Sequence, residues 1–572
     1  MSNLRVLVFV SSVVALVLAL GFDAFSLLWL GAFVLAFAAL VIRHDRIIVA
    51  LGRARDAMKV YEDGLARLDH GFAGRGVSAT DFAPDDHPYA ADLDLFGRGS
   101  LFELMCTART RSGQQQLAAW LCAPADLETV VARQKAVVEL RDRIDLREDL
   151  ALAGPAVDVD VQPATLTSWA EAESPLEPRA ARVLIALAWI LSISAVASVV
   201  SWALGWSGPL PLGAVLVAQW VSMRVFKARL EHVTRAVEPV RRQLAVLAEL
   251  CARLGRETFT DPTLARSQAL LVGRGQKEVS AFEAIARLER IVSWLEARQN
   301  QFFVIIAFAL MWTAHFGLAI ERWRAHHGND VRRWLAALAE LEALCALAGY
   351  TFEHPSDPFP ELSEDGPVLV GEDLGHPLLP PEANVRNSIE LGRPVRVVIV
   401  SGSNMSGKST LLRTVGINVA LALAGAPVRA GRMRLSRLQI GATLRVQDSL
   451  QQGASRFYAE IRRLRQVMDL ARGTTSLLYL LDEILHGTNS HDRKIGGQQL
   501  VRALADANAI GLVTTHDLAL AEIAEALGER ARNVHFADDI VDGQLHFDYR
   551  MRPGVVRKSN ALELMRSVGL DV

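Results

Sequence analysis

Long apolar runs interrupt an otherwise charged first two thirds of this chain. One pair of runs, Val6 to Phe22 and Ala24 to Ile42, is separated by a single acidic residue. A second pair, Val183 to Leu204 and Leu210 to Val221, flanks a short turn that contains glycine and proline. Apolar runs of about 20 residues match the hydrocarbon core of a bilayer. The pattern therefore predicts two membrane hairpins, and the last of the four arms is the shortest.

The charges that flank these runs indicate a topology. Arginines lie on both sides of the first pair, and its turn contains no lysine or arginine. The second pair is similar, with Arg179 and Arg182 before it and Arg224 after it. Because basic residues stay on the cytoplasmic side, both hairpins should return the chain to the cytoplasm. We therefore expect a multi-pass protein of the cell (inner) membrane with its C-terminal half in the cytoplasm.

Two other interpretations of these runs stay open at this point. The first run is also compatible with a cleaved signal peptide, since Ala19 and Gly21 form a small-residue pair near its end. The equally long apolar run that follows directly favours the hairpin. The second pair is also compatible with two helices buried in protein, because its second arm contains Pro211 and Gln219.

A fifth apolar run, Phe302 to Ile320, is long enough to span a bilayer but has basic flanks on both sides. Arg298 precedes it, and Arg322 and Arg324 follow it. An odd number of crossings would also place the C-terminal half outside the cytoplasm. We therefore expect this run to form a helix that is buried in protein or lies against the membrane.

Outside the hairpins, apolar positions first recur with helical spacing and later form short strands. Helices are expected over 47–68, 101–121, 127–140, most of 226–298 and 334–347. After a linker rich in Pro, Asp and Glu, short Val/Ile/Leu runs alternate with helices, as in an α/β layer. The expected fold is therefore multidomain, with all-α hairpins and a helical core followed by an α/β domain. The expected segments are 1–45 (first hairpin), 46–180 (helical), 181–223 (second hairpin), 224–354 (helical), 355–368 (linker) and 369–572 (α/β).

Composition changes this picture little. The chain has 61 Lys and Arg against 63 Asp and Glu, a formal net charge of -2. It has no global basic field, so contact with nucleic acid would need a local basic patch. The four cysteines are scattered without a Cys-x-x-Cys pair, which argues against a disulfide framework or a zinc site. Such cysteine usage fits a cytosolic main body.

A phosphate-binding pattern opens the α/β region. It fits Gly-x-x-x-x-Gly-Lys-[Ser/Thr] and consists of Gly402, Ser403, Asn404, Met405, Ser406, Gly407, Lys408 and Ser409, with Thr410 following. A strand-like run precedes it and an uninterrupted helical stretch to Ala424 follows it. In this context backbone amides surround phosphates at a helix N-terminus. We expect Lys408 to neutralise the β- and γ-phosphates of ATP and Ser409 to ligate Mg²⁺.

Two further strand ends carry candidate catalytic groups. The apolar run Ser476 to Leu481 ends in Asp482 and Glu483. We expect Asp482 to hold Mg²⁺ through water, and Glu483 to orient or deprotonate the attacking water. A third strand, Ile510 to Thr514, precedes His516, which is expected to sense the γ-phosphate.

Two residues between the loop and the carboxylates complete the predicted site. Gln447 lies where it could contact the metal or the attacking water. Ser455 belongs to the segment GASRFYAEI (Gly453 to Ile461), which leads into a helix. Its place upstream of Asp482 is that of a serine acting in trans in ATPases that hold two nucleotides between two subunits. The pattern therefore favours a homodimer.

Together these segments resemble the MutS family of ABC-type ATPases. GSNMSGKST is similar to the family's P-loop, LLYLLDEILHGTN to its Walker B block, VTTHDL to its histidine switch and GASRFYAEI to its signature helix. HPLL and Asn387 resemble the entry segment near the adenine, and Lys558 to Leu570 resembles the closing helix. The resemblance implies that 369–572 is a MutS-type ATPase domain and that Ser455 contacts the γ-phosphate in trans.

Upstream the resemblance is weaker and includes departures. Ser100 to Pro124 and Arg133 to Leu140 resemble the family's helical core and lever, and Arg333 to Ala348 resembles the end of the lever. The expected departures are the absence of the mismatch-reading N-terminal domain and of the clamp insertion, a hairpin within the lever, and Leu485-His486 in place of Gly-Arg. These affect mismatch recognition more than ATP binding or dimerisation.

The sequence therefore favours a membrane-anchored, MutS-like ATPase that hydrolyses ATP at a dimer interface and is coupled to DNA binding. One alternative is an ATP-gated membrane scaffold that binds an unknown protein partner without DNA, which the balanced charge favours. The other is an ABC-transporter-type ATPase. Against it, the hydrophobic segments form separate hairpins, and no LSGGQ-like sequence precedes Asp482.

Overall fold

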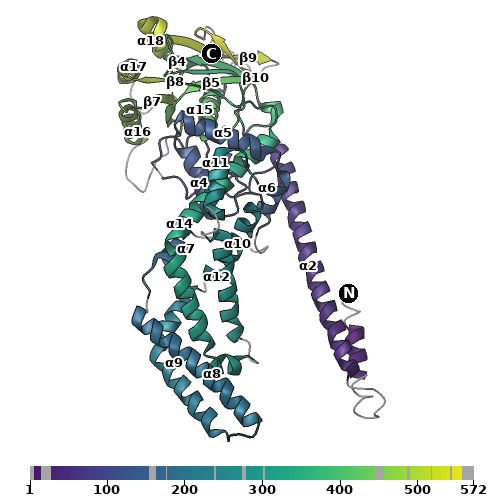
Figure 1. The fold of residues 1–572 in the computed structure, drawn as a ribbon. Coiled ribbons are helices and arrows are strands. Elements are labelled where there is room, and N and C mark those ends of the chain that lie inside the picture. Colours follow the sequence, from purple (N-terminus) through teal and green to yellow (C-terminus); the bar gives the residue numbers. More distant parts are fainter. Residues whose placement is uncertain are drawn as a thin grey trace. The chain divides into compact units, whose positions relative to one another are not determined.

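The structure is a computed structural model of the 572-residue chain. It describes residues 6–14, 28–84, 86–153, 163–174, 177–237, 240–273, 279–299, 303–445, 456–485, 490–516, 518–541 and 544–556. The chain forms two compact units (Figure 1). One comprises Met1–Leu65 and Pro155–Asp158, and the other comprises Ala66–Gly154 and Val159–Val572.

The first unit is helical where it is described. Residues 6–14 are helical, and α2 (Leu28–Leu68) is a single helix of 41 residues whose last turn belongs to the second unit. It joins the second predicted arm to the helix predicted over 47–68, because no proline interrupts the stretch. Many of its apolar side chains are exposed, among them Leu35 and Val49. The turn predicted near Asp23 lies outside the described residues.

The helical part of the second unit confirms the predicted helical core. Its α-helices are α3 (Leu101–Met105), α4 (Arg111–Cys122), α5 (Leu127–Arg141), α6 (Ile144–Ala151), α7 (Pro163–Glu171), α8 (Pro178–Ala203), α9 (Leu210–Val237), α10 (Arg241–Leu254), α11 (Pro262–Val272), α12 (Ala281–Glu296), α13 (Val304–Ala309) and α14 (Trp312–Glu353). In α11 the proline stands in the first turn, where its missing N–H costs nothing.

The longest of these helices, α14, is the central element of the helical part (Figure 1). It extends 42 residues, about 63 Å, and packs against α4, α5, α7, α11 and α12. The helix predicted over 334–347 is its buried C-terminal portion. The apolar run Phe302 to Ile320 is not one helix, because Met311 adopts a left-handed conformation (φ 45°) between α13 and α14.

The single helix predicted over 101–121 is wrong, because α3 ends at Met105 and Thr110 caps a second helix. The Ser100 hydroxyl accepts from the amide of Glu103 and starts α3, and the Thr110 hydroxyl accepts from the amide of Gly113 and starts α4. Glu342 of α14 stabilises the break by accepting from the amide of Thr110 at 3.0 Å. Burial raises the pKa of Glu342 to about 7, although these donors oppose the shift.

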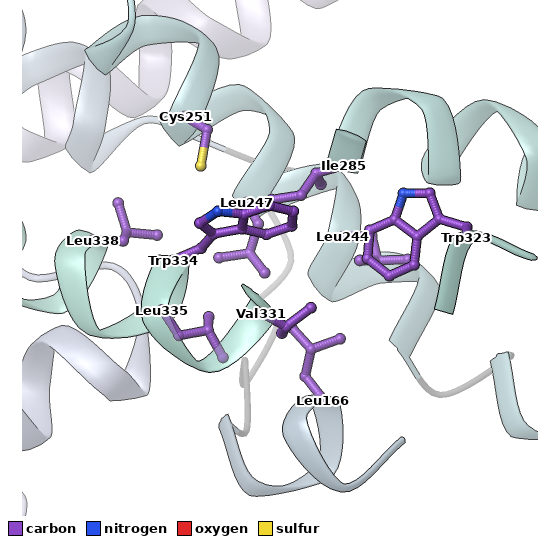
Figure 2. Close-up of a pocket in the computed structure, with 10 residues that line it drawn as sticks. All are labelled: Leu166, Leu244, Leu247, Cys251, Ile285, Trp323, Val331, Trp334, Leu335 and Leu338. Carbon is purple, nitrogen blue, oxygen red and sulfur yellow. The ribbon is translucent and has the colours of Figure 1, made fainter. Parts of the chain in front are cut away.

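The core of the helical part is closely packed. A cavity of only about 10 Å³ remains between α7, α10, α12 and α14, no more than a single water molecule needs. Figure 2 shows its apolar lining, which includes Leu247, Trp323 and Trp334. The space is therefore a packing defect and offers no polar group to a ligand.

The C-terminal part confirms the predicted α/β domain. Its larger sheet has the order β10-β9-β4-β8-β7-β6, in which β10 alone is antiparallel to its neighbour. The strands are β4 (Val397–Ser401), β6 (Leu438–Thr443), β7 (Ser476–Leu481), β8 (Ala509–Thr515), β9 (Ala531–Val541) and β10 (Gln544–Pro553). The smaller sheet, in the order β1-β5-β2-β3, is formed by β1 (Glu361–Ser363), β2 (Leu369–Leu374), β3 (Asn387–Leu391) and β5 (Arg432–Ser436).

Two cores cover the two faces of the larger sheet. In β4, Val398 and Val400 join the core shared with α15 (Lys408–Ala424) and the helical part, whereas Val397 and Ile399 face the second core. The second core is completed by α16 (Arg456–Ala471), α17 (Ser490–Asp506) and α18 (Leu518–Leu527). Burial on both faces explains why the central strands are continuously apolar.

Candidate nucleotide-binding site

The candidate site begins where β4 ends and α15 starts. The connecting loop contains Gly402 (φ 153°) and Gly407 (φ 104°), both with positive φ. A Cβ at Gly402 would lie 2.8 Å from the hydroxyl of Ser406 and 3.2 Å from the carbonyl of Phe536. Glycine is therefore required there, both for the conformation and for the close approach. The predicted strand, loop and helix lie in this order, with α15 starting two residues earlier than expected.

Lys408 occupies the inside of this loop. Its ammonium group donates to the carbonyls of Gly402 and Ser403, at 2.8 Å each, and lies 3.5 Å from a carboxylate oxygen of Glu483. Only 4% of the side chain is exposed. The loop carbonyls and the carboxylate partly offset the cost of burying this charge.

The sheet order brings the predicted Ser409 and Asp482 together. Strand β8 lies between β4 and β7, so the residues that follow β4 and β7 converge at one edge of the sheet. The hydroxyl of Ser409 donates to Asp482 Oδ2 at 2.6 Å. Thr514 of β8 donates to Oδ1 of the same carboxylate and accepts from the amide of Glu483 at 3.0 Å. Thr514 was not predicted as a site residue, although it lies two residues before His516.

Glu483 lies between a lysine and a histidine. Its carboxylate is 3.5 Å from Lys408 Nζ and 3.6 Å from His516 Nδ1. Its backbone has a left-handed conformation, with φ of 46°. Such a conformation in a non-glycine residue costs about 1–3 kcal/mol and is typical of functional sites. Glu460 of α16 stabilises the turn that follows by accepting from the amide of Leu485.

A cavity of about 590 Å³ opens in front of the loop. One wall is formed by loop and helix residues from Asn404 to Thr414, and the other by residues of the smaller sheet and its connections. Tyr549 of β10 closes one side, and its ring would lie 3.1 Å from a Cβ at Gly407. Asn387 holds this part of β10 by donating to the carbonyl of Tyr549 at 3.0 Å and accepting from the amide of Met551 at 2.7 Å. The volume suits a ligand of nucleotide size.

His376 lines the same cavity and is buried. Burial, assisted by nearby Arg413, lowers the pKa of His376 to about 4, so the ring is neutral near pH 7. Its Nδ1 accepts from the amide of Leu378 at 3.2 Å, which assigns the proton to Nε2. Asn384 exchanges two hydrogen bonds with the backbone of His376 and fixes this turn.

A buried aspartate of the helical part supports the site from outside the cavity. Asp92 accepts from the amides of Leu444 and Arg445, at 2.7 and 2.8 Å, directly after β6. Its second oxygen accepts from Arg463 of α16 at 2.9 Å. It therefore holds the chain on both sides of residues 446–455. Sequence reasoning missed this role, because Asp92 is more than 350 positions from its amide partners.

Not every predicted site residue can be placed. Gln447 and Ser455 lie outside the described residues, as does the predicted closing helix from Lys558 to Leu570. Asn404, Met405 and Thr410 line the cavity, and 85% of Met405 is exposed. The structure thus brings together Lys408, Ser409 and the two carboxylates, with His516 beside them.

Residues 398–571 match the family model of MutS domain V. The DNA mismatch repair protein MutS of Natronomonas pharaonis is 31% identical over 238 residues, which cover 41% of this chain and 27% of that protein. The endonuclease MutS2 of Thermus thermophilus is 34% identical over 196 residues, 34% of this chain and 25% of that protein. The DNA mismatch repair protein MSH4 of Arabidopsis thaliana is 32% identical over 234 residues, 39% of this chain and 29% of that protein. The chain thus spans less than a third of the length of these relatives.

Proposed function

We propose that this chain, which belongs to the MutS family, is a membrane-anchored ATPase coupled to DNA binding. ATP would bind in the cavity in front of the loop from Gly402 to Ser409. The observation that carries the proposal is the convergence of Lys408, the Ser409–Asp482 pair and Glu483 at one edge of the sheet. These groups are the ones that phosphoryl transfer to water requires.

The residues present fit both ATP and Mg²⁺. Backbone amides of the loop and the N-terminus of α15 favour phosphate, and buried Lys408 supplies a compensating charge. The buried hydroxyl of Ser403 has no hydrogen-bond partner among the described residues, so it is available to a ligand. Ser409 and Asp482 offer the hard oxygen ligands that Mg²⁺ prefers. Bound there, the ion would neutralise charge on the β- and γ-phosphates.

Each side chain of the site then has its own role in ATP hydrolysis. Lys408 stabilises the negative charge of the phosphates, and Glu483 accepts a proton from the attacking water or orients it. His516, 3.6 Å from Glu483, is placed to orient this carboxylate or to contact the γ-phosphate. Thr514 links the two carboxylate residues, because its hydroxyl donates to the side chain of Asp482 and accepts from the backbone amide of Glu483.

Two substitutions test the ATPase proposal. Lys408→Ala should abolish binding of a fluorescent ATP analogue, whereas Glu483→Gln should bind it and lose turnover. The ion pair of Lys494 and Glu522, on the surface of the same domain, supplies matched controls. Lys494→Ala and Glu522→Gln should bind and hydrolyse ATP like the unsubstituted chain. Unchanged turnover in Glu483→Gln would remove it as the catalytic carboxylate.

The homodimer is proposed from the predicted role of Ser455 in trans. If two chains enclose two nucleotides, Glu483→Gln should accumulate as an ATP-bound dimer, because it cannot complete hydrolysis. Light scattering of the detergent-solubilised chain with and without ATP would show the change in mass. A mass that stays monomeric with saturating ATP would contradict the shared site.

DNA is proposed as ligand because two of the relatives are named DNA mismatch repair proteins. A protein that binds phosphates through basic groups loses affinity steeply as salt rises. Binding to homoduplex, mismatched and branched DNA should therefore be measured from low to physiological salt. No binding to any of them at low salt would remove DNA and favour a scaffold that binds a protein partner.

Membrane anchoring is proposed from the apolar helices. Among the described residues, two stretches are long and apolar enough to cross a bilayer, Arg179–Ala203 and Trp312–Glu353. The apolar part of the first is 22% buried and that of the second 83%, so only the first is free to contact lipid. A reporter fused into the turn at residues 21–23 should report the non-cytoplasmic side. A cytoplasmic signal would overturn the predicted topology of the first hairpin.

A further inference from the structure

The helices α8 and α9 form an antiparallel pair whose sides are apolar and exposed. Leu184 of α8 and Leu230 of α9 pack together at the open end of the pair. No charged residue lies between Arg182 and Arg224, so the uncharged part extends from there to the connecting turn. Large apolar side chains point outward along both helices: Trp189, Ile190, Ile193, Val196, Val199, Val200, Trp202, Val217, Trp220 and Val221 are about half exposed or more.

Helix α13 presents a second exposed apolar surface. Three of its six residues are at least half exposed, Val304 at 50%, Ile305 at 77% and Ile306 at 50%. The first turns of α14, in contrast, are buried at Ala314 and Leu318. The left-handed Met311 between the two helices separates the exposed part of the apolar run from the buried part.

Gln219 joins α13 to the α8–α9 pair. It is fully buried on α9, and its amide donates to the carbonyl of Leu191 at 3.1 Å and to that of Ala309 at 2.8 Å. These bonds set the level of α13 along the pair. Gln219 lies five residues, about 7.5 Å, from Arg224 along α9, and it holds Ala309 near this level. The C-terminal end of α13 therefore lies near the charged end of the pair and well short of its tip.

Tryptophans mark the same level. Trp189 of α8, Trp220 of α9 and Trp294 of α12 are each more than half exposed. Trp220 lies under the guanidinium of Arg224, 5.7 Å from ring centre to Cζ. Exposed tryptophans next to the first basic residues are typical of the boundary between hydrocarbon and headgroups.

We propose that α13 inserts into the headgroup side of the bilayer beside the α8–α9 pair and returns without crossing it. The proposal rests on the proposed membrane attachment and adds a third contact to it. A lipid surface is the occupant that the charges favour, because Arg182, Arg224 and Arg298 all flank this apolar surface. A second copy of the chain would bring these like charges together, whereas anionic headgroups complement them.

The test is the depth of a fluorescent probe in vesicles of phosphatidylcholine and phosphatidylglycerol. Single cysteines replace Ile305 on α13, Ile193 halfway along the uncharged part of α8, and Val138, which is exposed on α5. They are introduced into the full chain with its four native cysteines replaced, and each carries the environment-sensitive label NBD. Bromine atoms on the lipid chains, near the headgroup or near the chain middle, quench labels at their own depth. ATP turnover checks that each labelled chain is folded.

The probe at 305 should be quenched mainly by bromine near the headgroup, the probe at 193 mainly by bromine at the chain middle, and the probe at 138 by neither. Loss of quenching at 305 alone would overturn the insertion of α13 and show that protein covers it. Loss at both 305 and 193 would overturn membrane attachment itself. Stronger quenching of 305 by the deep bromine would contradict shallow insertion. Gln219→Leu should weaken quenching at 305 and leave 193 unchanged, because it removes the bond to Ala309.

Discussion

The nucleotide site buries charged groups, whereas the surface formed by the exposed apolar side chains of α8, α9 and α13 (the α8–α9–α13 surface) leaves apolar groups uncovered. In the site, Lys408 is almost fully withdrawn from water, and the hydroxyls of Ser409 and Thr514 hold the carboxylate of Asp482. At the α8–α9–α13 surface, large apolar side chains are exposed, and the buried Gln219 donates to two carbonyls. A soluble monomer rarely exposes a contiguous apolar surface of this kind. We therefore propose a polyanion as the ligand of the first region and a lipid phase around the second.

Helix α14 connects the two regions. Its first turns pack on α8 and α9, and its later turns pack on α4 and α5, which in turn contact α15 of the nucleotide site. The helix is about 63 Å long, which lets it contact both regions. We expect the first region to depend on its polar contacts much more strongly than the second.

The largest effect is expected at Asp92, the buried anchor of the polar region. Asp92→Ala leaves Nη2 of Arg463 and two backbone amides without their acceptor. Breaking a buried ion pair in this way costs about 3–5 kcal/mol. Urea unfolding followed by far-ultraviolet circular dichroism would measure the loss. Asp506→Ala, in an exposed pair with Arg530, is the control and should cost at most about 1 kcal/mol. Equal losses in both variants would contradict the anchoring role.

A pH effect of similar size is expected at Glu342, on the helix that joins the two regions. Its folded-state pKa, about 7, lies above the usual 4.5, so the folded state favours the protonated carboxyl. Its contribution to stability is complete below about pH 4.5 and is lost as the pH rises through about 7, a change of about 3 kcal/mol. Glu342→Gln should flatten this part of the curve of unfolding free energy against pH. The same slope in the variant and the unsubstituted chain would contradict the assignment.

A smaller effect, on catalysis, is expected at Thr514. Thr514→Val removes the bond to Asp482 while keeping the shape of β8, and positioning residues of this kind contribute about 10- to 100-fold to activity. The turnover number should fall while the KM for ATP changes little, because the loop that binds phosphate is untouched. Thr443→Val is the matched control, since this threonine also ends a strand and its hydroxyl has no partner among the described residues. A drop in turnover in the control as well would show that the loss comes from altered packing at the strand ends and not from the missing hydrogen bond.

The smallest effect is expected at Gln219 in the apolar region. Hydrogen bonds between membrane helices contribute about 0.6 kcal/mol on average, so Gln219→Leu should change unfolding of the chain in mixed micelles only slightly. A loss as large as that of Asp92→Ala would contradict the comparison. It would show that polar contacts hold both regions equally.

The elements that could be predicted from the sequence are those whose structure depends on residues nearby in the chain. The strand, glycine loop and helix around Lys408 were recognised from glycine spacing and apolar runs, and the strand ending in Asp482 and Glu483 was predicted with the same bounds as β7. The single helix over 101–121 was wrong, because Thr110 caps a new helix there and Glu342 of α14 holds this cap in place. The run from Phe302 was predicted as one helix, and nothing in its apolar pattern marks the left-handed Met311 that divides it.

The sequence by itself determined which chemical groups the site contains, because short motifs place a lysine, a hydroxyl and two carboxylates at strand ends. Only the tertiary structure decided how they are held. Thr514 joins the two carboxylate residues because β8 lies between β4 and β7, and Asp92 reaches β6 and α16 from the helical part. The order of strands and the packing of distant helices select these partners. Local patterns of apolar and polar residues carry no information about that choice.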